Sequence, residues 1–281
     1  MKTVGLFLAL LGIALAAPHQ KLIFGGQEAS QGMFPNYVYL LVYSMEGHSS
    51  ICGGALISPY HILTAAYCVN DMNTTISTAS VGAVDIDTIE TAAGVQTRNI
   101  IDAKIHPGWK ARGPWSVVAD DIAIAVVDQP FELNDIVKLT NVLADDTDLF
   151  RLHWATIQGF GVYNYTGRYA LSSEKLLWTY VPLISHDVCH KAWLKISKNQ
   201  TKITEDQVCA GRNGYGPGSG DSGGPLQMRK DNTYYQIGLV SFGGFGIKAS
   251  MDQADYPAVY TRVSKYCDFI RSASGGAYKC Q

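Results

Sequence analysis

The chain has 281 residues, of which 47% are hydrophobic and 16% charged, and its formal net charge is −2. This composition excludes a wholly disordered chain, because enough apolar side chains are present to bury a sizeable core. No run of Lys and Arg exceeds two residues, so neither a nucleic-acid groove nor a basic membrane-binding patch is indicated.

The first residues have the pattern of a secretory signal peptide. Lys2 supplies a positive charge, residues 4–17 are apolar, and Ala14, Leu15 and Ala16 form a site for signal peptidase. We therefore expect residues 1–16 to be removed and the chain to be secreted. No later stretch approaches the eighteen apolar residues of a membrane span.

Secretion affects how the cysteines are interpreted. They are Cys52, Cys68, Cys189, Cys209, Cys267 and Cys280. An even number in an oxidising compartment predicts three disulfides, and the sequence alone leaves fifteen pairings open. The chain has no Cys-x-x-Cys motif, so we expect no metal site and no cofactor. Three sequons predict exposed, glycosylated loops at Asn73, Asn164 and Asn199.

Short segments rich in β-branched and aromatic residues recur between Gly, Pro, Asn and Asp residues. In chain order they include Tyr37–Tyr43, Ile62–Ala65, Ile122–Val127, Trp154–Ile157, Tyr235–Ser241 and Ala258–Val263. Strands this short and frequent predict an all-β barrel or sandwich. Near the end, Val263, Tyr266, Cys267 and Ile270 follow the helical spacing i, i+3, i+4 and i+7, which predicts one helix that closes the β protein.

A set of motifs then occurs in a fixed order. They are Ile23–Gly26, Cys52–Ile57, Leu63–Cys68, Asp121–Ile124, Gly220–Pro225, Ser241–Gly243 and Pro257–Val263. In this order they resemble the trypsin/chymotrypsin family of serine endopeptidases, over roughly residues 23–271. The resemblance implies an all-β, chymotrypsin-like double six-stranded β-barrel with a C-terminal helix, and a peptidase domain at residues 23–281.

The resemblance also implies catalytic roles. Ser222 matches the nucleophile, Asp121 matches the carboxylate that orients the base, and the N–H groups of Gly220 and Ser222 match the oxyanion hole. The family carries a His after Thr-Ala-Ala, but here that position is Tyr67, and His61 lies six residues earlier. Because a tyrosine has a pKa near 10, it is a poor base at neutral pH.

Tyr67 leaves several interpretations open. On one interpretation Tyr67 simply marks the loss of the base. On another, its side chain is a plug that fills the catalytic corner, by which we mean the place of the missing histidine side chain. On a third, Tyr67 is a sequence error or polymorphism, since Tyr and His codons differ by one base. Ser222 either retains residual catalysis or belongs to a structural loop. Asp121 is, on the plainer interpretation, a buried carboxylate hydrogen-bonded to its surroundings, with the Tyr67 hydroxyl as one candidate partner.

The resemblance implies activation by cleavage. Residues 17–22 would be a short propeptide, and the freed Ile23 would pair with Asp221. Leu22 precedes Ile23, so a trypsin-like activator that cuts after Lys21 would leave one extra residue. Activation is therefore in question independently of the missing histidine.

The implied specificity pocket is altered as well. Gly216 stands where trypsin-like members carry Asp, so no preference for Lys or Arg is expected. Gly243 keeps one wall open, whereas Ala258 narrows another by about one methyl group. Gly218 occupies one position of the family's pocket disulfide, which is absent, and the segment 244–256 is longer than usual. We predict a pocket for an uncharged side chain of modest size.

The resemblance implies specific disulfides. It pairs Cys52 with Cys68 and Cys189 with Cys209, which leaves Cys267 and Cys280 for the third bond. Other mapped pairs would favour an unrelated binding protein, such as a lectin-like sandwich.

We therefore predict a secreted, monomeric serine peptidase homologue that is catalytically inactive or severely impaired. It would bind a protein or peptide ligand in the old substrate cleft, with no nucleic acid and no membrane as partners. The alternative is an active serine endopeptidase that prefers small to medium uncharged side chains. That activity would need a histidine from the substrate, or a true His at position 67.

Overall fold

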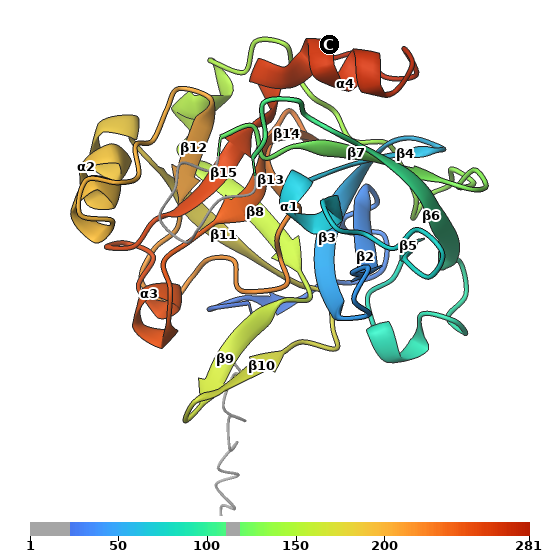
Figure 1. Ribbon diagram of the computed structural model, residues 1–281, viewed down its shortest axis with the longest axis horizontal. Helices are drawn as coiled ribbons and strands as arrows, with labels where there is room; N and C mark the ends of the chain where they lie inside the picture. Colours follow the sequence, from blue (N-terminus) through green and yellow to red (C-terminus); the bar gives the residue numbers. More distant parts are fainter. Residues whose placement is uncertain (1–22, 111–118) are drawn as a thin grey trace, which may run out of the picture.

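The computed structural model describes residues 23–110 and 119–281, and its strands form two β-barrels that lie side by side (Figure 1). The predicted signal peptide and propeptide lie outside the described residues. The first barrel is antiparallel and closes in the order β2-β3-β4-β7-β6-β5. Its strands are β2 (Tyr37–Tyr43), β3 (Ser49–Ser58), β4 (His61–Thr64), β5 (Thr78–Val81), β6 (Gln96–Ile105) and β7 (Ala123–Val127).

The second barrel has six antiparallel strands in the order β11-β12-β15-β14-β13-β8, and the β11–β8 pairing closes it. They are β8 (Trp154–Gly159), β11 (Leu177–Ile184), β12 (Gln207–Ala210), β13 (Pro225–Lys230), β14 (Thr233–Phe242) and β15 (Ala258–Arg262). The short β1 (Gln27–Glu28) pairs with β11. A hairpin of β9 (Val162–Thr166) and β10 (Tyr169–Ser172) projects from the body (Figure 1). The double barrel predicted from the motifs is confirmed.

The helices are α1 (Ala66–Val69), α2 (His186–Ile196), α3 (Ile247–Met251) and α4 (Cys267–Ala273), with 3₁₀ turns η1 (Ile86–Thr88), η2 (Leu149–Leu152) and η3 (Val263–Tyr266). Three helices, α2, α3 and α4, lie at the outside of the molecule, whereas α1 lies near its middle beside β3 (Figure 1). The predicted terminal helix is present as η3 followed by α4. The prediction of a single helix missed α2, which is short and buries Cys189 and Trp193 against the second barrel.

Each barrel has its own core, and a third cluster of buried side chains joins them. That cluster contains Leu63 and Ile124 from the first barrel and Leu239 from the second. The terminal helix adds Ile270 to the same cluster. The first and second barrels therefore share apolar contacts.

The disulfides have the pairs expected from the resemblance. They are Cys52–Cys68, Cys189–Cys209 and Cys267–Cys280. The first fastens α1 to β3, the second fastens α2 to β12, and the third ties the C-terminal tail to the start of α4. Within the described part of the chain, no helix is both long and apolar enough to cross a membrane.

Candidate active site

The loop that carries Ser222 is tied to both barrels. The N–H of Gly53 in β3 donates to the Ser222 carbonyl at 2.8 Å, and the N–H of Gly223 donates to the carbonyl of Val240 in β14 at 2.8 Å. A Cβ on Gly53 would lie 2.6 Å from the Cα of Gly224, so the two backbones approach too closely for any side chain. This close approach positions Ser222 where the barrels meet.

The reactive groups of this loop are available. Ser222 is half-buried, and among the described residues its hydroxyl has no hydrogen-bond partner. The N–H groups of Gly220 and Ser222 also have no partner within the described ranges. Gly220 has φ +99°, a conformation that favours glycine. Two unpaired N–H groups beside a serine hydroxyl are what an oxyanion hole requires.

Asp121 is fully buried just before β7 and is held by three donors. Its Oδ1 accepts from the N–H of Tyr67 at 2.9 Å, and its Oδ2 accepts from the Ser241 hydroxyl at 2.5 Å. The N–H of Ala66 donates to the same carboxylate. Burial raises the pKa of Asp121 to about 6, although these hydrogen bonds act in the opposite direction.

The hydrogen bond between Tyr67 and Asp121 uses the backbone N–H of Tyr67 and not its side chain. Its side chain is 68% exposed, and the phenol hydroxyl has no hydrogen-bond partner in the described parts of the chain. The interpretations of Tyr67 as a plug and as a hydroxyl donor to Asp121 are therefore wrong for this conformation. α1 holds the residue in place, because the neighbouring Cys68 is bonded to Cys52.

No other histidine takes the place of the base in the described structure. His61 lies at the start of β4, whereas Thr64, which leads to the catalytic corner, lies at its end. The Nδ1 of His61 is 2.7 Å from the Ser58 hydroxyl oxygen, and burial lowers the pKa of the His61 imidazole. His61 is therefore a hydrogen-bonded structural histidine.

Asp221 occupies a cage built largely from backbone. Its Oδ1 accepts from the N–H of Gly161 and its Oδ2 from the N–H of Gly218, both at 2.8 Å. A Cβ on Gly159 would lie 2.0 Å from the same Oδ1, so the cage requires glycine there. Burial raises the pKa of Asp221 to about 6. Ile23 is also buried, in the core of the second barrel, and its ion pair with Asp221 after cleavage stays a prediction.

The three predicted pocket residues belong to the second barrel: Gly216 lies between β12 and β13, and Gly243 and Ala258 lie at the two ends of the connection from β14 to β15. Gly216 precedes the Ser222 loop and is buried, whereas Gly243 follows β14 and has open space where a Cβ would stand. Ala258 begins β15, is 2% exposed and packs in the core of this barrel. The roles assigned to these residues stay predictions.

Comparisons with known proteins decide the family. The model of the Trypsin family matches residues 23–270, which is nearly all of the described chain. The chain belongs to the trypsin family of serine proteases. The match contains both barrels and every motif that carries the candidate site.

Individual relatives agree with this assignment. Chymotrypsin-C of Mus musculus is 31% identical over 89% of this chain and 87% of its own length. Serine protease Hayan of Drosophila melanogaster is 31% identical over 88% of this chain, and clotting factor G beta subunit of Tachypleus tridentatus is 29% identical over 90%. This trypsin-family chain spans only 38% of Hayan and 33% of serine proteinase stubble of Drosophila melanogaster.

The structure adds Gln253 to the candidate site, a residue that sequence reasoning missed. Gln253 is 3% exposed, and its Nε2 donates to the carbonyls of Pro217 at 2.8 Å and Ser250 at 3.1 Å. A Cβ on Gly216 would lie 1.7 Å from its Oε1. The signal available in the sequence was the length of the segment 244–256, although nothing in it singles out this residue.

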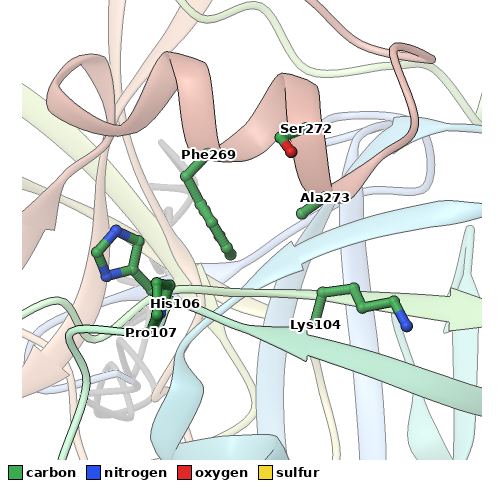
Figure 2. Close-up of a pocket in the computed structure, with 6 residues that line it drawn as sticks. All are labelled: Lys104, His106, Pro107, Phe269, Ser272 and Ala273. Atoms are coloured by element: carbon green, nitrogen blue, oxygen red, sulfur yellow. The ribbon is translucent and has the colours of Figure 1, made fainter.

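A cavity of about 510 Å³ lies elsewhere, between the end of β6 and α4 (Figure 2). It is lined by Lys104, His106, Pro107, Phe269, Ser272 and Ala273. The ring of His106 contacts that of Phe269 edge-on, with centroids 4.9 Å apart. None of the predicted site residues lines this cavity.

Proposed function

We propose that this chain is a secreted member of the trypsin family that has lost peptidase activity and acts by binding a protein or peptide. The observation that carries the proposal is the environment of Ser222. Its hydroxyl has no base within the described residues, and the side chain of Tyr67 extends into solvent. A serine hydroxyl without a base is a weak nucleophile.

The magnitude of the loss supports inactivity. Removing the catalytic His of subtilisin lowers kcat by a factor on the order of 10⁶. The unpaired N–H groups of Gly220 and Ser222 would stabilise an oxyanion, but they cannot remove the proton of the nucleophile. The retained loop still offers a shaped surface for a ligand, so binding survives where catalysis does not.

Secretion and monomeric state belong to the same proposal. Three disulfides are typical of proteins from oxidising compartments. The exposed side chains of Asn164 and Asn199 would be accessible to glycosylation, and Asn73 is partly exposed. Glycan analysis of the secreted chain tests all three sequons.

The activity claim is tested with the chain 23–281 that has a free amino group on Ile23. We expect it to cleave casein no faster than its Ser222→Ala variant, since both lack a competent serine. Cleavage well above the Ser222→Ala background would overturn the proposal.

An active endopeptidase is the second candidate, and the intact Asp121 and the free N–H groups favour it. In that case a histidine of the substrate would act as the base. Peptides that contain histidine near the cleaved bond would then be hydrolysed by the native chain but not by Ser222→Ala, whereas matched peptides with alanine would remain intact.

A further inference from the structure

The cavity between the end of β6 and α4 is open to solvent, and none of its lining residues belongs to the candidate active site (Figure 2). Its volume of about 510 Å³ falls within the roughly 300–1,000 Å³ that small-molecule sites occupy. Both of its sides are anchored in the fold. α4 starts at Cys267, which is bonded to Cys280, and β6 pairs with β5 and β7 in the first barrel. The cavity is therefore a fixed feature of the molecule.

One wall of the cavity is aromatic. Figure 2 shows the Phe269 side chain extending from α4 toward β6, with His106 on one side of it and Lys104 on the other. The rings of His106 and Phe269 meet edge-on, with centroids 4.9 Å apart. His106 is held in turn by the N–H of Gly108, which donates to its Nδ1 at 3.2 Å, and by an edge-on contact with Tyr266. No other aromatic ring contacts Phe269 among the described residues, so its other face is free to stack on the ring of a ligand.

The rim of the cavity supplies hydrogen-bond donors. The Lys104 ammonium lies 2.6 Å from the Asp102 carboxylate, and both side chains are half-exposed. An ammonium has three N–H groups, and Asp102 is the only partner of this one in the described ranges. The Ser272 hydroxyl is exposed and has no hydrogen-bond partner in the same part of the chain. These donors suit the oxygens of an acidic group, and water screens the repulsion that the half-exposed Asp102 exerts on it.

We propose that this cavity binds a small aromatic acid, whose ring stacks on the free face of Phe269 and whose carboxylate accepts from the Lys104 ammonium and the Ser272 hydroxyl. Pro107, Ala273 and the methylene groups of Lys104 supply the apolar contacts around the ring. A cationic ligand is disfavoured, because its charge would face the ammonium at the rim. The site goes beyond the proposed function and does not depend on it, since the two use separate residues.

The test uses two probes of the same shape, 2-naphthoate and its neutral analogue 2-naphthamide. Each is titrated into the secreted chain, and binding is followed by saturation-transfer NMR. Both probes present a ring and a carbonyl oxygen, so their comparison isolates the charge. We expect 2-naphthoate to bind about three- to fivefold more tightly than 2-naphthamide, the ratio expected of one solvent-exposed charge pair.

Charge variants assign the binding to this cavity. Lys104→Met keeps the apolar stem and removes the ammonium, so it should weaken 2-naphthoate about three- to fivefold and leave 2-naphthamide nearly unchanged. Its matched control is Lys265→Met, at an exposed lysine outside the lining, which should change neither affinity. Ser272→Glu adds a negative charge at the rim and should weaken 2-naphthoate alone. Ala277→Glu adds the same charge at an exposed position outside the lining and should not.

The aromatic wall is tested with Phe269→Leu, which removes the ring face and should weaken both probes. The wild-type titration and the Lys104→Met comparison decide the matter even where Phe269→Leu fails to fold. Equal affinities of the two probes, no saturable binding of 2-naphthoate at millimolar concentrations, or equal 2-naphthoate affinities in Lys104→Met and Lys265→Met would overturn the assignment.

The candidate active site provides a further control. Ser222→Ala should bind both probes as the wild type does, because Ser222 does not line the cavity. Loss of 2-naphthoate binding in that variant would place the probe in the active site and overturn the assignment. Casein cleavage by the native chain would overturn the loss of activity alone.

Discussion

The buried carboxylate of Asp121 should destabilise this protein at neutral pH, and Asp121→Asn should remove that effect. Burial raises its pKa from 3.8 to about 6. The unfolded chain therefore releases this proton at lower pH than the folded chain does. The native state is not penalised below pH 3.8, and the penalty grows until the pH has passed the folded pKa.

The size of the effect follows from the shift. A difference of about two pKa units corresponds to about 3 kcal/mol at pH 7, at roughly 1.4 kcal/mol per unit. Most of this penalty is absent at pH 4, so the contribution of Asp121 to the free energy of unfolding should fall by about 2 kcal/mol between pH 4 and pH 7. Asparagine fits the site, because its Oδ1 can accept from Tyr67 while its Nδ2 donates to the Ser241 hydroxyl.

The assay is guanidinium denaturation of the wild type and Asp121→Asn, with disulfides intact, at intervals from pH 4 to pH 7. Other titrating groups, Asp221 included, are common to both chains and cancel in the difference. We expect the variant to gain about 2 kcal/mol relative to wild type as the pH rises. A difference that is flat with pH, or that grows in favour of wild type, would refute the reasoning.

Two further predictions concern packing and charge. Gly53→Ala should lower the free energy of unfolding by about 2 kcal/mol or more, because the new methyl group would clash with the backbone of Gly224. The control is Gly243→Ala, whose methyl group would meet no atom within 4 Å and should change the free energy of unfolding little. Equal effects of the two variants in thermal denaturation would contradict the close approach of Gly53 and Gly224. Arg262→Met should lower the free energy of unfolding by about 3 kcal/mol, because it leaves the carboxylate of Asp146, whose side chain is 3% exposed, without its ion-pair partner. Arg151→Met removes an exposed ion pair and should lower it by less than about 0.5 kcal/mol. Equal shifts of the two urea denaturation midpoints would contradict this prediction.

The double barrel could be predicted because its signals are local and occur in a fixed order. Segments such as Tyr37–Tyr43 are short continuous runs of aromatic and aliphatic residues, and the structure has a strand at those same bounds. The disulfide pairs followed from the family resemblance that these motifs carry, since four of the six cysteines lie outside the motifs themselves. α2 was missed although its sequence carries a helical signal, because Cys189, Ala192, Trp193 and Ile196 follow the spacing i, i+3, i+4 and i+7, and Cys189 and Trp193 are buried.

The candidate site was predicted at the level of residues but not of their neighbours. The sequence indicates that Tyr67 precedes Cys68 and that Asp121 directly precedes a predicted strand, Ile122–Val127. It does not indicate that Tyr67 is exposed to solvent, because the side-chain rotamer depends on which neighbouring surfaces the folded barrels leave free. Gln253 was missed for the same reason, since its contact with Gly216 arises between two loops that lie far apart in sequence.

The central claim, that the absence of a base at position 67 silences an otherwise intact site, is tested most directly by labelling with a fluorophosphonate probe. The chain 23–281 with a free Ile23 amino group is compared with its Tyr67→His variant, in which an imidazole could lie between Asp121 and Ser222. We predict that only Tyr67→His is labelled and that Ser222→Ala in that background abolishes the labelling. Equal labelling of the native chain at Ser222 would contradict the account.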